Sequence, residues 1–419
     1  MHPNALLELT ACLVHSVMRF DAPADGVISA FFRQERQLGA RDRHALAETA
    51  YDVLRRRLLY EHLARSGSGP TERRLAILGW QGDQAFMRVA LQPHEVRWLD
   101  EARAVDLSTL PAKLRHNLPD WLAGQLQAAL GDEFEALAES LNQPAPLDLR
   151  VNALKAKRDD VRAALRGAAV DSEPTPYSPW GLRVQGKPAL TRLTSFMAGE
   201  VEVQDEGSQL LALVTDAHRG EMVVDFCAGA GGKTLALGAA MRNTGRLYAF
   251  DVSGHRLDAM KPRLARSGLS NVYPAQIAHE CDERIKRLAG KIDRVLVDAP
   301  CSGLGTLRRN PDLKWRQTPN AVVELRQKHE AILESAARLP KPGGRLVYAT
   351  CSLLSSENED AASAFIERHA NSFRPLPMLD VLQKAKVSGA ESLVNGDYLR
   401  LWPHRHGTDG FFAAAWERI

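Results

Sequence analysis

The C-terminal half of the chain alternates short apolar strands with amphipathic helices, and this pattern constrains the fold most. From Gly220 onward, five strands are predicted as runs of apolar residues, at 222–226, 246–250, 272–277, 293–297 and 345–349. Amphipathic helices are predicted between them, notably at 254–267 and 320–339. Apolar strands separated by helices indicate a parallel sheet covered on both faces. Residues 398–402 and 410–416 flank a His/Gly turn and predict an antiparallel hairpin at one edge. Ligands of such sheets bind beyond the carboxyl ends of the strands.

The N-terminal third shows a helical pattern instead. Over residues 4–141, apolar residues recur at three- and four-residue spacing between Pro and Gly interruptions, which predicts helices throughout. One predicted helix covers residues 41–58 and carries Arg55, Arg56 and Arg57 near its end. These side chains predict either a patch for an RNA backbone or an ordinary solvated helix end, and charge alone leaves both interpretations open.

A third pattern lies between these two regions. Residues 147–151 alternate as a short strand, residues 158–167 predict a helix, and residues 181–184 predict a second strand. This segment is interpreted as a small α+β connector. The sequence therefore predicts a helical domain, the connector and an α/β domain, at residues 1–135, 136–205 and 206–419.

Length and charge limit the classes of function. A chain of 419 residues is too long for one compact core, which agrees with several domains. Its 54 basic and 51 acidic residues leave a net charge of +3, so any contact with nucleic acid is expected to be local. The N-terminus lacks the pattern of a signal peptide, and no run of about 18 residues is apolar enough to span a membrane. These observations predict a cytoplasmic protein.

Five cysteines, an odd number without CxxC or Cys/His pairing, argue against a disulfide framework and a zinc site. Free thiols are therefore expected. Cys12 and Cys281 are predicted to be small buried hydrophobes, and Cys227 is predicted to pack beside a ligand loop. Cys301 and Cys351 instead follow two predicted strands at the ligand-facing edge, where thiolates can be activated.

A glycine-rich loop, DFCAGAGGKT at residues 225–234, lies between the first strand and a helix. Glycines there let a ligand approach the backbone, and a helix N-terminus favours a carboxylate or phosphate. The Gly-Lys-Thr ending is compatible with a phosphate-binding P-loop, but the position that requires glycine, five residues before Gly232, is Cys227. Asp251 ends the next strand, where it can accept hydrogen bonds from a ribose diol. These features favour an adenosyl cofactor over a nucleotide phosphate.

The residues at the ends of the fourth and fifth strands suit methylation of a cytosine. Asp298 and Cys301 follow the fourth strand, and Cys351 follows the fifth. Carbon 5 of cytosine is too weak a nucleophile to take a methyl group unaided, but adding a thiolate to carbon 6 activates it. An acid near N3 stabilises the charge that develops, and a second thiol can assist the release of the product.

The sequence resembles the two-cysteine RNA cytosine-5 methyltransferases of the Nop/Sun family, specifically the bacterial branch that acts on small-subunit ribosomal RNA. The resemblance is carried by CAGAGGKT (227–234), DAPCSG (298–303), RRNPDLKW (308–315), YATCS (348–352) and DGFF (409–412). Upstream, LRVN (149–152) and VQDEGSQL (203–210) are similar to the family's connector. LGARDRHALAETAYDVL (38–54) is similar to its NusB-like helical domain.

This resemblance implies an α/β fold with a class I (Rossmann-like) S-adenosylmethionine methyltransferase sheet, preceded by an all-α NusB-like domain and the connector. It implies that Cys351 is the nucleophile, that Cys301 serves product release and that Asp298 orients the base. The implied cofactor is S-adenosyl-L-methionine, bound by Cys227, Ala228, Gly229, Ala230, Gly231, Gly232, Lys233, Asp251 and Asp298. The implied partner is RNA, with 16S rRNA expected, recognised by the helical domain and the connector. No membrane or metal is expected, and a monomer is favoured.

Two positions depart from the family's pattern. Gly229 and Ala230 replace the usual Ala-Pro, which changes the rigidity of the loop but keeps the close approach of its backbone. The third strand ends at Ile277, preceded by Gln276, where the family usually has an acid that contacts the adenosine. The adenine contacts of this chain are therefore expected to differ.

Two alternatives remain at this point. DNA cytosine-5 methyltransferases also place a Pro-Cys after the fourth strand, but they lack the Thr-Cys at the fifth and carry a large target-recognition region that is missing here. The second alternative is a catalytically silent RNA-binding assembly factor on the same fold. The presence of Asp298, Cys301 and Cys351 argues against it, whereas Ile277 leaves room for it.

Overall fold

The computed structural model describes residues 1–419 and divides into two compact units. The first unit contains residues 1–144 and 306–319, and the second contains residues 145–305 and 320–419. None of the helices combines the length and hydropathy that a membrane span requires.

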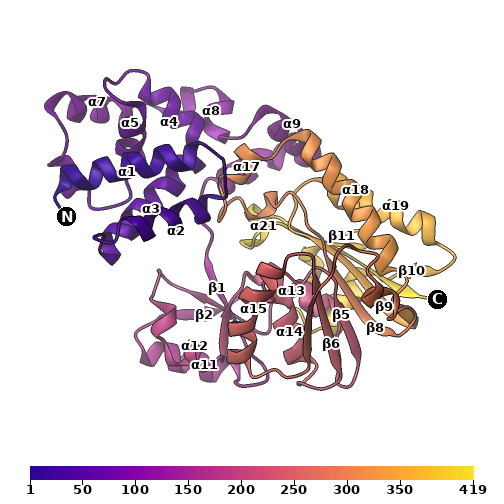
Figure 1. The fold of residues 1–419 in the computed structure, drawn as a ribbon. Helices are drawn as coiled ribbons and strands as arrows, with labels where there is room; N and C mark the ends of the chain where they lie inside the picture. Colours follow the sequence, from indigo (N-terminus) through magenta and orange to yellow (C-terminus); the bar gives the residue numbers. More distant parts are fainter. The chain divides into compact units, whose positions relative to one another are not determined.

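The first unit is entirely helical, as predicted (Figure 1). Helices α1, α3 and α5 pack together around a core that includes Leu13, Val14, Leu46, Val53 and Ile77. Its helices are α1 (Pro3–Met18), α2 (Ala24–Gln34), α3 (Ala40–Arg55), α4 (Arg57–Ala64), α5 (Thr71–Leu78), α6 (Gln84–Arg88), α7 (Pro93–Arg103), α8 (Ala112–His116), α9 (Asp120–Leu130), α10 (Phe134–Leu141) and, in the returning segment, α17 (Leu313–Arg316).

The predicted helix over residues 41–58 is wrong at its C-terminal end. Helix α3 stops at Arg55, and Arg56 leaves helical geometry with φ −112° and ψ 29°. The returning segment supplies the reason, because Trp315 Nε1 donates to the carbonyl of Leu54 (2.7 Å) and Lys314 Nζ donates to that of Arg55 (2.8 Å). These donors satisfy the last carbonyls of the helix, which would otherwise require a further helical turn or water.

Neither interpretation of the arginine cluster describes Arg55. Its side chain is buried, and its guanidinium donates to the carbonyl of Arg308 (3.0 Å). Arg56 bonds to Asp52 and Tyr60 within the unit. Arg57 pairs with Glu61 at 2.7 Å and stacks on aromatic rings. The cluster therefore holds the helical unit together rather than facing solvent as a basic patch.

The connector folds as a four-stranded antiparallel sheet in the order β2-β3-β1-β4. The predicted helix at 158–167 and strands at 147–151 and 181–184 are confirmed. The elements are β1 (Leu147–Val151), α11 (Arg158–Gly167), β2 (Ser172–Pro174), β3 (Gly181–Val184), α12 (Thr194–Met197) and β4 (Val201–Val203).

The second unit is built on a nine-stranded mixed sheet in the order β11-β12-β13-β9-β8-β5-β6-β7, with β10 paired to β13. Strands β9, β8, β5, β6 and β7 are parallel, and β13 joins them antiparallel to β9. The five predicted parallel strands and the antiparallel pairing of the hairpin are confirmed, but β11 lies outside the hairpin and forms the edge of the sheet. The strands are β5 (Met222–Asp225), β6 (Arg246–Asp251), β7 (Val272–Gln276), β8 (Ile292–Asp298), β9 (Pro340–Thr350), β10 (Phe373–Pro375), β11 (Val394–Asn395), β12 (Tyr398–Leu401) and β13 (Phe411–Arg418).

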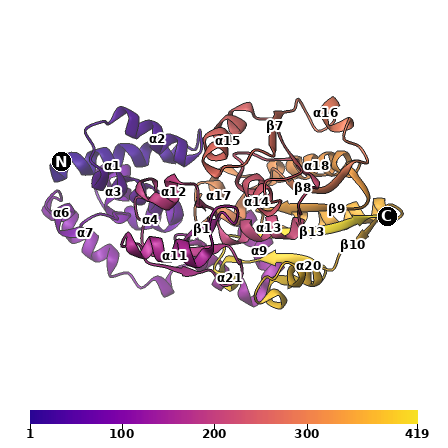
Figure 2. The same cartoon turned by 90° about the horizontal axis from the view of Figure 1, so that it is seen from below.

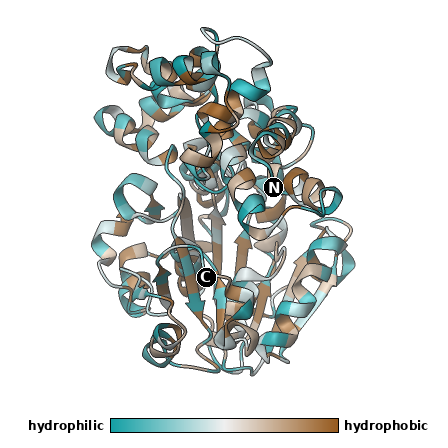
Figure 3. Ribbon diagram, turned by 90° about the vertical axis from the view of Figure 1, so that its left-hand side faces the viewer, coloured by the Kyte–Doolittle hydropathy of each residue, from teal (hydrophilic) through white to brown (hydrophobic).

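Helices cover both faces of this sheet, which is why its central strands are apolar on both sides (Figures 2 and 3). One face packs against α13 (Glu206–Thr215), α14 (Gly232–Ala240), α15 (Gly254–Ser267) and α20 (Met378–Lys384). The other packs against α16 (Glu283–Lys286), α18 (Pro319–Ala336) and α19 (Glu359–His369). The short helix α21 (Pro403–His406) lies between β12 and β13. Such an arrangement leaves the strand ends as the place for a ligand.

Candidate functional site

A cleft of 380 Å³ opens at the carboxyl ends of the parallel strands. Its walls combine apolar side chains with three thiols, three carboxylates and one guanidinium. The lining residues are Phe226, Cys227, Asp251, Val252, Arg256, Ile277, Glu280, Asp298, Ala299, Pro300, Cys301, Ile332 and Cys351. Five predicted site residues, Cys227, Asp251, Asp298, Cys301 and Cys351, are thereby brought together. The remaining six, residues 228–233, follow Cys227 in the loop and first turn of α14 and do not line the cleft.

The glycine loop turns sharply between β5 and α14. Gly229 and Gly231 have φ of 55° and 85°, a region that favours glycine. A Cβ on Gly229 would meet only the flexible guanidinium of Arg256, so the positive φ is what favours glycine at this position. Gly231 is the N-cap of α14, so the N-terminus of that helix lies at the glycine loop.

Asp251 ends β6 beside this loop, and its carboxylate is nearly buried. It accepts the backbone N–H of Gly229 and that of Ser253, both at 2.8 Å. Each oxygen of a carboxylate can accept more than one hydrogen bond. Each oxygen of Asp251 therefore keeps an acceptor position that fits a hydroxyl of a ribose. The residues present thus fit an adenosyl cofactor.

Lys233 lies in the first turn of α14, and its ammonium pairs with Asp298 at 2.7 Å. Burial lowers the pKa of Lys233, but the charge and hydrogen bond of Asp298 outweigh it, so that pKa lies above its ordinary value. A P-loop lysine must instead reach the phosphates of its nucleotide. The ion pair therefore favours the adenosyl interpretation.

The two thiols meet at the centre of the site. Cys301 follows β8 and Cys351 follows β9, and their sulfur atoms lie 3.3 Å apart. This separation is well beyond the roughly 2.05 Å of a disulfide, so both are free. The backbone N–H of Cys351 also donates to the sulfur of Cys301 at 3.3 Å. The hydrogen bond to Cys351 and burial raise the pKa of Cys301 well above that of a free thiol.

A buried carboxylate holds the two thiol loops together. Glu357 lies in the 3₁₀ turn Ser355–Glu357 and is fully buried. It accepts the backbone N–H of Ser302 (2.9 Å) and the hydroxyls of Ser302 and Ser352 (2.5 Å each). These serines directly follow the two cysteines, so one side chain fixes both loops.

The charges around the thiols make them unequal. The negative charge of Glu357 raises the pKa of Cys301, whereas the Lys233 ammonium is close enough to Cys351 for the thiolate charge to raise the pKa of the lysine. Cys301 is thus faced by an anion and Cys351 by a cation, so the electrostatic surroundings of the two thiols differ.

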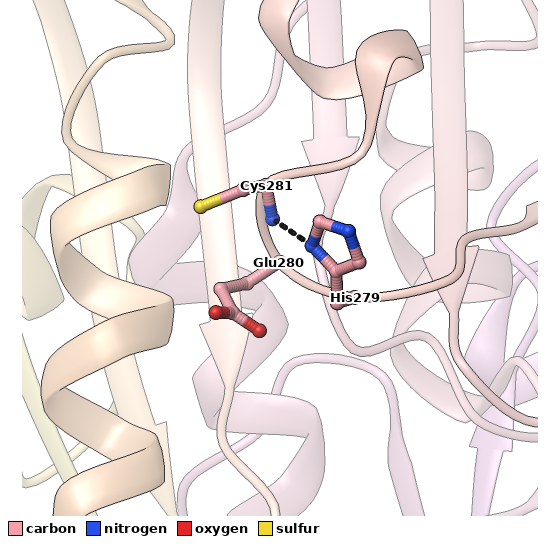
Figure 4. A group of neighbouring side chains, drawn as sticks. All are labelled: His279, Glu280 and Cys281. Carbon is pink, nitrogen blue, oxygen red and sulfur yellow. Dashed lines mark hydrogen bonds between the residues drawn. The ribbon is translucent and has the colours of Figure 1, made fainter.

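The other predicted positions differ in outcome. Cys12 is exposed on α1, so its prediction as a buried hydrophobe is wrong, because the apolar stripe of that helix passes beside it. Cys281 is only half-buried and lies beside His279 and Glu280 (Figure 4). Ile277 is buried and lines the cleft, and the neighbouring Gln276 amide donates to the carbonyl of Val252 (3.1 Å). An acid is therefore absent from the end of β7.

Two functional candidates, Glu357 and Glu280, were missed from sequence. Glu357 could not be recognised from its spacing in the sequence, because one of its partners, Ser302, lies 55 residues away. Glu280 lies beyond the strand end where an acid was expected, and only its place in the cleft distinguishes it from the acids that follow it.

Comparisons with known proteins identify the family of this chain. The family model described as 16S rRNA methyltransferase RsmB/F matches residues 212–417, and a model of the ferredoxin-like domain of RsmF/B-like methyltransferases matches residues 118–191. The probable ribosomal RNA small subunit methyltransferase B of Bacillus subtilis (strain 168) is 31% identical over 341 residues, which cover 80% of this chain and 74% of that one. The chain belongs to the RsmB/F methyltransferase family.

A second RsmB/F relative is the probable ribosomal RNA small subunit methyltransferase B of Synechocystis sp., 36% identical over 302 residues. That match covers 72% of this chain and 66% of the relative, about two thirds of its length. The crystal structure of PH0851 is 27% identical, with a TM-score of 0.80 and coverage of 100% of this chain and 99% of that one. The predicted α/β fold of an S-adenosylmethionine-dependent methyltransferase, preceded by helices, is confirmed.

Proposed function

We propose that this RsmB/F member transfers a methyl group from S-adenosyl-L-methionine to carbon 5 of a cytosine in small-subunit ribosomal RNA. The observation that carries the proposal is the pair of thiols, 3.3 Å apart in one cleft with Asp251 and Asp298. The names of the relatives, ribosomal RNA small subunit methyltransferases B, support the substrate. The cofactor, when bound, supplies an electrophilic methyl group.

In the first step the Cys351 thiolate adds to carbon 6 of the cytosine. As the carbon–sulfur bond forms, the electrons of the 5,6 double bond shift to the 4,5 bond and those of the 3,4 double bond shift onto N3. Carbon 5 becomes the nucleophilic end of an enamine. Lys233 stabilises the thiolate before the attack. Asp298, held by its ion pair with Lys233, faces the cleft and orients the base. Carbon 5 would then take the methyl group, and the electron pair of the broken methyl–sulfur bond would stay on the cofactor's sulfur.

Product release requires loss of the proton from carbon 5 and cleavage of the bond between carbon 6 and sulfur. We assign the proton to Cys301. Its pKa is raised chiefly by the hydrogen bond to Cys351, and that contribution disappears once Cys351 is bonded to carbon and uncharged. Cys301 is thus easier to ionise in the adduct and can act as the base. The electron pair of the broken bond returns to the sulfur of Cys351.

The two cysteines give a direct test. Cys351→Ser is expected to abolish methyl transfer from labelled cofactor to unmethylated small-subunit rRNA. Cys301→Ser is expected to trap a covalent protein–RNA adduct, seen as a shifted band on a denaturing gel. Cys12→Ser, an exposed thiol in the helical unit, is the matched control and should behave as wild type. An adduct in Cys351→Ser but not in Cys301→Ser would reverse the roles.

The same assay tests the alternative of a silent assembly factor, which predicts RNA binding without methyl transfer by the wild-type chain. Recognition of the rRNA by the helical unit and the connector, a cytoplasmic location and a monomeric state belong to this proposal as well. The domain limits at residues 135 and 205 stay predictions.

A further inference from the structure

The cleft contains three carboxylates, and only one of them makes no hydrogen bond or ion pair within the protein. Asp251 accepts two backbone N–H groups, and Asp298 pairs with Lys233. The half-buried carboxylate of Glu280 lines the cleft without such a partner. A carboxylate that lines a cleft and accepts no hydrogen bond from the protein can accept one from a donor group of a ligand.

The loop that carries Glu280 is fixed by its other residues. Asp282 accepts the backbone N–H groups of Ala278 (3.0 Å) and Arg284 (2.9 Å). His279 Nδ1 accepts the N–H of Cys281 at 3.1 Å, and Ser335 on α18 donates its hydroxyl to the carbonyl of Glu280 at 2.5 Å. Figure 4 shows the three neighbouring side chains leaving the backbone in different directions. The backbone of Glu280 is thus held while its carboxylate stays unengaged.

The order of the strands places Glu280 at the end of the cleft away from the thiols. Along the edge the sequence is β9, β8, β5, β6 and β7, which carry in turn Cys351, Cys301, Cys227, Asp251 and Ile277. A cofactor that presents its methyl group to the cysteines and its ribose to Asp251 therefore extends its base toward β7. Val252, Ile277 and Ile332 give that end apolar walls suited to the faces of a purine.

We propose that Glu280 accepts a hydrogen bond from the exocyclic amino group of the cofactor's adenine and thereby selects adenosine over 6-oxo nucleosides. The inference rests on the proposed function, since it concerns the same cofactor. Glu280 lies three residues beyond Ile277, which gives the cleft only an apolar wall.

Titration calorimetry of the full chain with S-adenosylhomocysteine and with its inosine counterpart tests this role without turnover. The wild type is expected to prefer the adenine form by about tenfold or more, the size of a hydrogen bond to a charged acceptor. Glu280→Ala should lose most of that preference, through weaker binding of the adenine form. Glu280→Gln can donate its amide to a 6-oxo group, so it should shift the preference toward the inosine form.

Glu283→Gln removes an exposed carboxylate three residues away that does not line the cleft, and it should retain the wild-type preference. The inference is overturned if Glu280→Ala weakens both nucleosides equally, or if both Glu280 variants keep the preference for adenine. It is also overturned if Glu280 instead belongs to a metal site with His279 and Cys281, whose ligand atoms lie within 4.8 Å of one another. Zn²⁺ alone would then bind the wild type and not Glu280→Ala, while the nucleoside preference stayed unchanged.

The outcomes separate this inference from the function on which it rests. A wild-type chain that binds neither nucleoside contradicts the proposed function, and the inference with it. A wild-type chain that binds S-adenosylhomocysteine and methylates RNA, with unchanged preference in both variants, contradicts the role of Glu280 alone.

Discussion

Asp225 ends β5 directly before the glycine loop, and its carboxyl is buried. It accepts the hydroxyl of Thr234 at 2.7 Å, but burial, together with the charges of Asp298 and Asp251, raises its pKa from 3.8 to about 7. Folding therefore favours the protonated form. The stability that results is fully present below the unfolded pKa near 3.8 and is lost as pH rises through about 7.

Replacing this carboxyl with an amide should remove that pH dependence. Between pH 5 and pH 8 the wild type should lose about 3 kcal/mol of unfolding free energy that Asp225→Asn keeps. The carboxyl of Asp225 is ionised in the unfolded chain but protonated in the folded chain over roughly two pH units of that range. Urea denaturation at both pH values measures the difference. Asp397→Asn, an exposed carboxylate, is the control and should leave the dependence unchanged. Parallel curves for Asp225→Asn and wild type would contradict the assignment.

At the scale of elements, the site is a junction between two strand ends. Strands β8 and β9 are adjacent and parallel, which brings Cys301 and Cys351 to one edge. Adjacency alone does not set their distance, because each thiol lies on a loop. Glu357 removes that freedom through its bonds to Ser302 and Ser352. We regard Glu357 as a positioning residue, since it touches neither sulfur directly.

Glu357→Gln should disturb both geometry and charge. We expect methyl transfer to fall by about a hundredfold, because small displacements of reacting groups cost that much. The breakdown of the RNA adduct should speed up as pH rises, and this rise should begin at a lower pH than in wild type. The reason is that the variant lacks the Glu357 anion, which raises the pKa of Cys301.

The pH profile of adduct breakdown, measured by quenched samples on denaturing gels, separates positioning from general loss of structure. Cys301 is faced by Cys351, Glu357 and Tyr348, and of these only Glu357 is changed. Asp360→Asn on α19 is the matched control, as its exposed carboxylate lies outside the junction. An unshifted profile in Glu357→Gln would leave only a structural role.

At the scale of the whole molecule, the chain leaves the second unit after Gly305, contributes residues 306–319 to the helical unit and returns. That segment begins five residues after Cys301. It is fastened to α3 by Lys314, Trp315 and Arg55, and Asp312 accepts the N–H of Ala24 at 3.2 Å. Burial lowers the pKa of Lys314 well below its usual value, as expected for an ammonium enclosed in protein. The helical unit is incomplete without this segment.

Trp315→Phe should therefore destabilise the helical unit. The carbonyl of Leu54 loses its indole donor, which costs about 1–2 kcal/mol when the acceptor stays buried. Urea unfolding followed by far-ultraviolet circular dichroism measures the loss. Trp121→Phe, the same substitution on α9, is the control. Equal effects of the two substitutions would mean that the bond to Leu54 contributes nothing specific.

Much of this protein was predictable from sequence because the signals are local. The five parallel strands, the helices at 158–167 and 254–267 and the glycine loop follow from apolar patterning and glycine placement within short windows. Cys301 and Cys351 were placed in one site because parallel strands share an edge. The family motifs identified the fold and the cofactor for the same reason, since each motif is a short contiguous run.

The tertiary structure decided what depends on partners distant in sequence. Arg55 is buried and is not part of a basic patch, because residues 308–315, more than 250 positions later in the sequence, pack against its helix. The inequality of the two thiols comes from Lys233, whose charge interacts with Cys351, and from Glu357, whose charge acts on Cys301. Glu280 gained a candidate role only once the cleft placed it beside Ile277. Sequence alone identified the two cysteines, Asp251 and Asp298 as site residues, but only the tertiary structure added Glu280 and Glu357 and set the charges around the thiols, because burial and charge act through space.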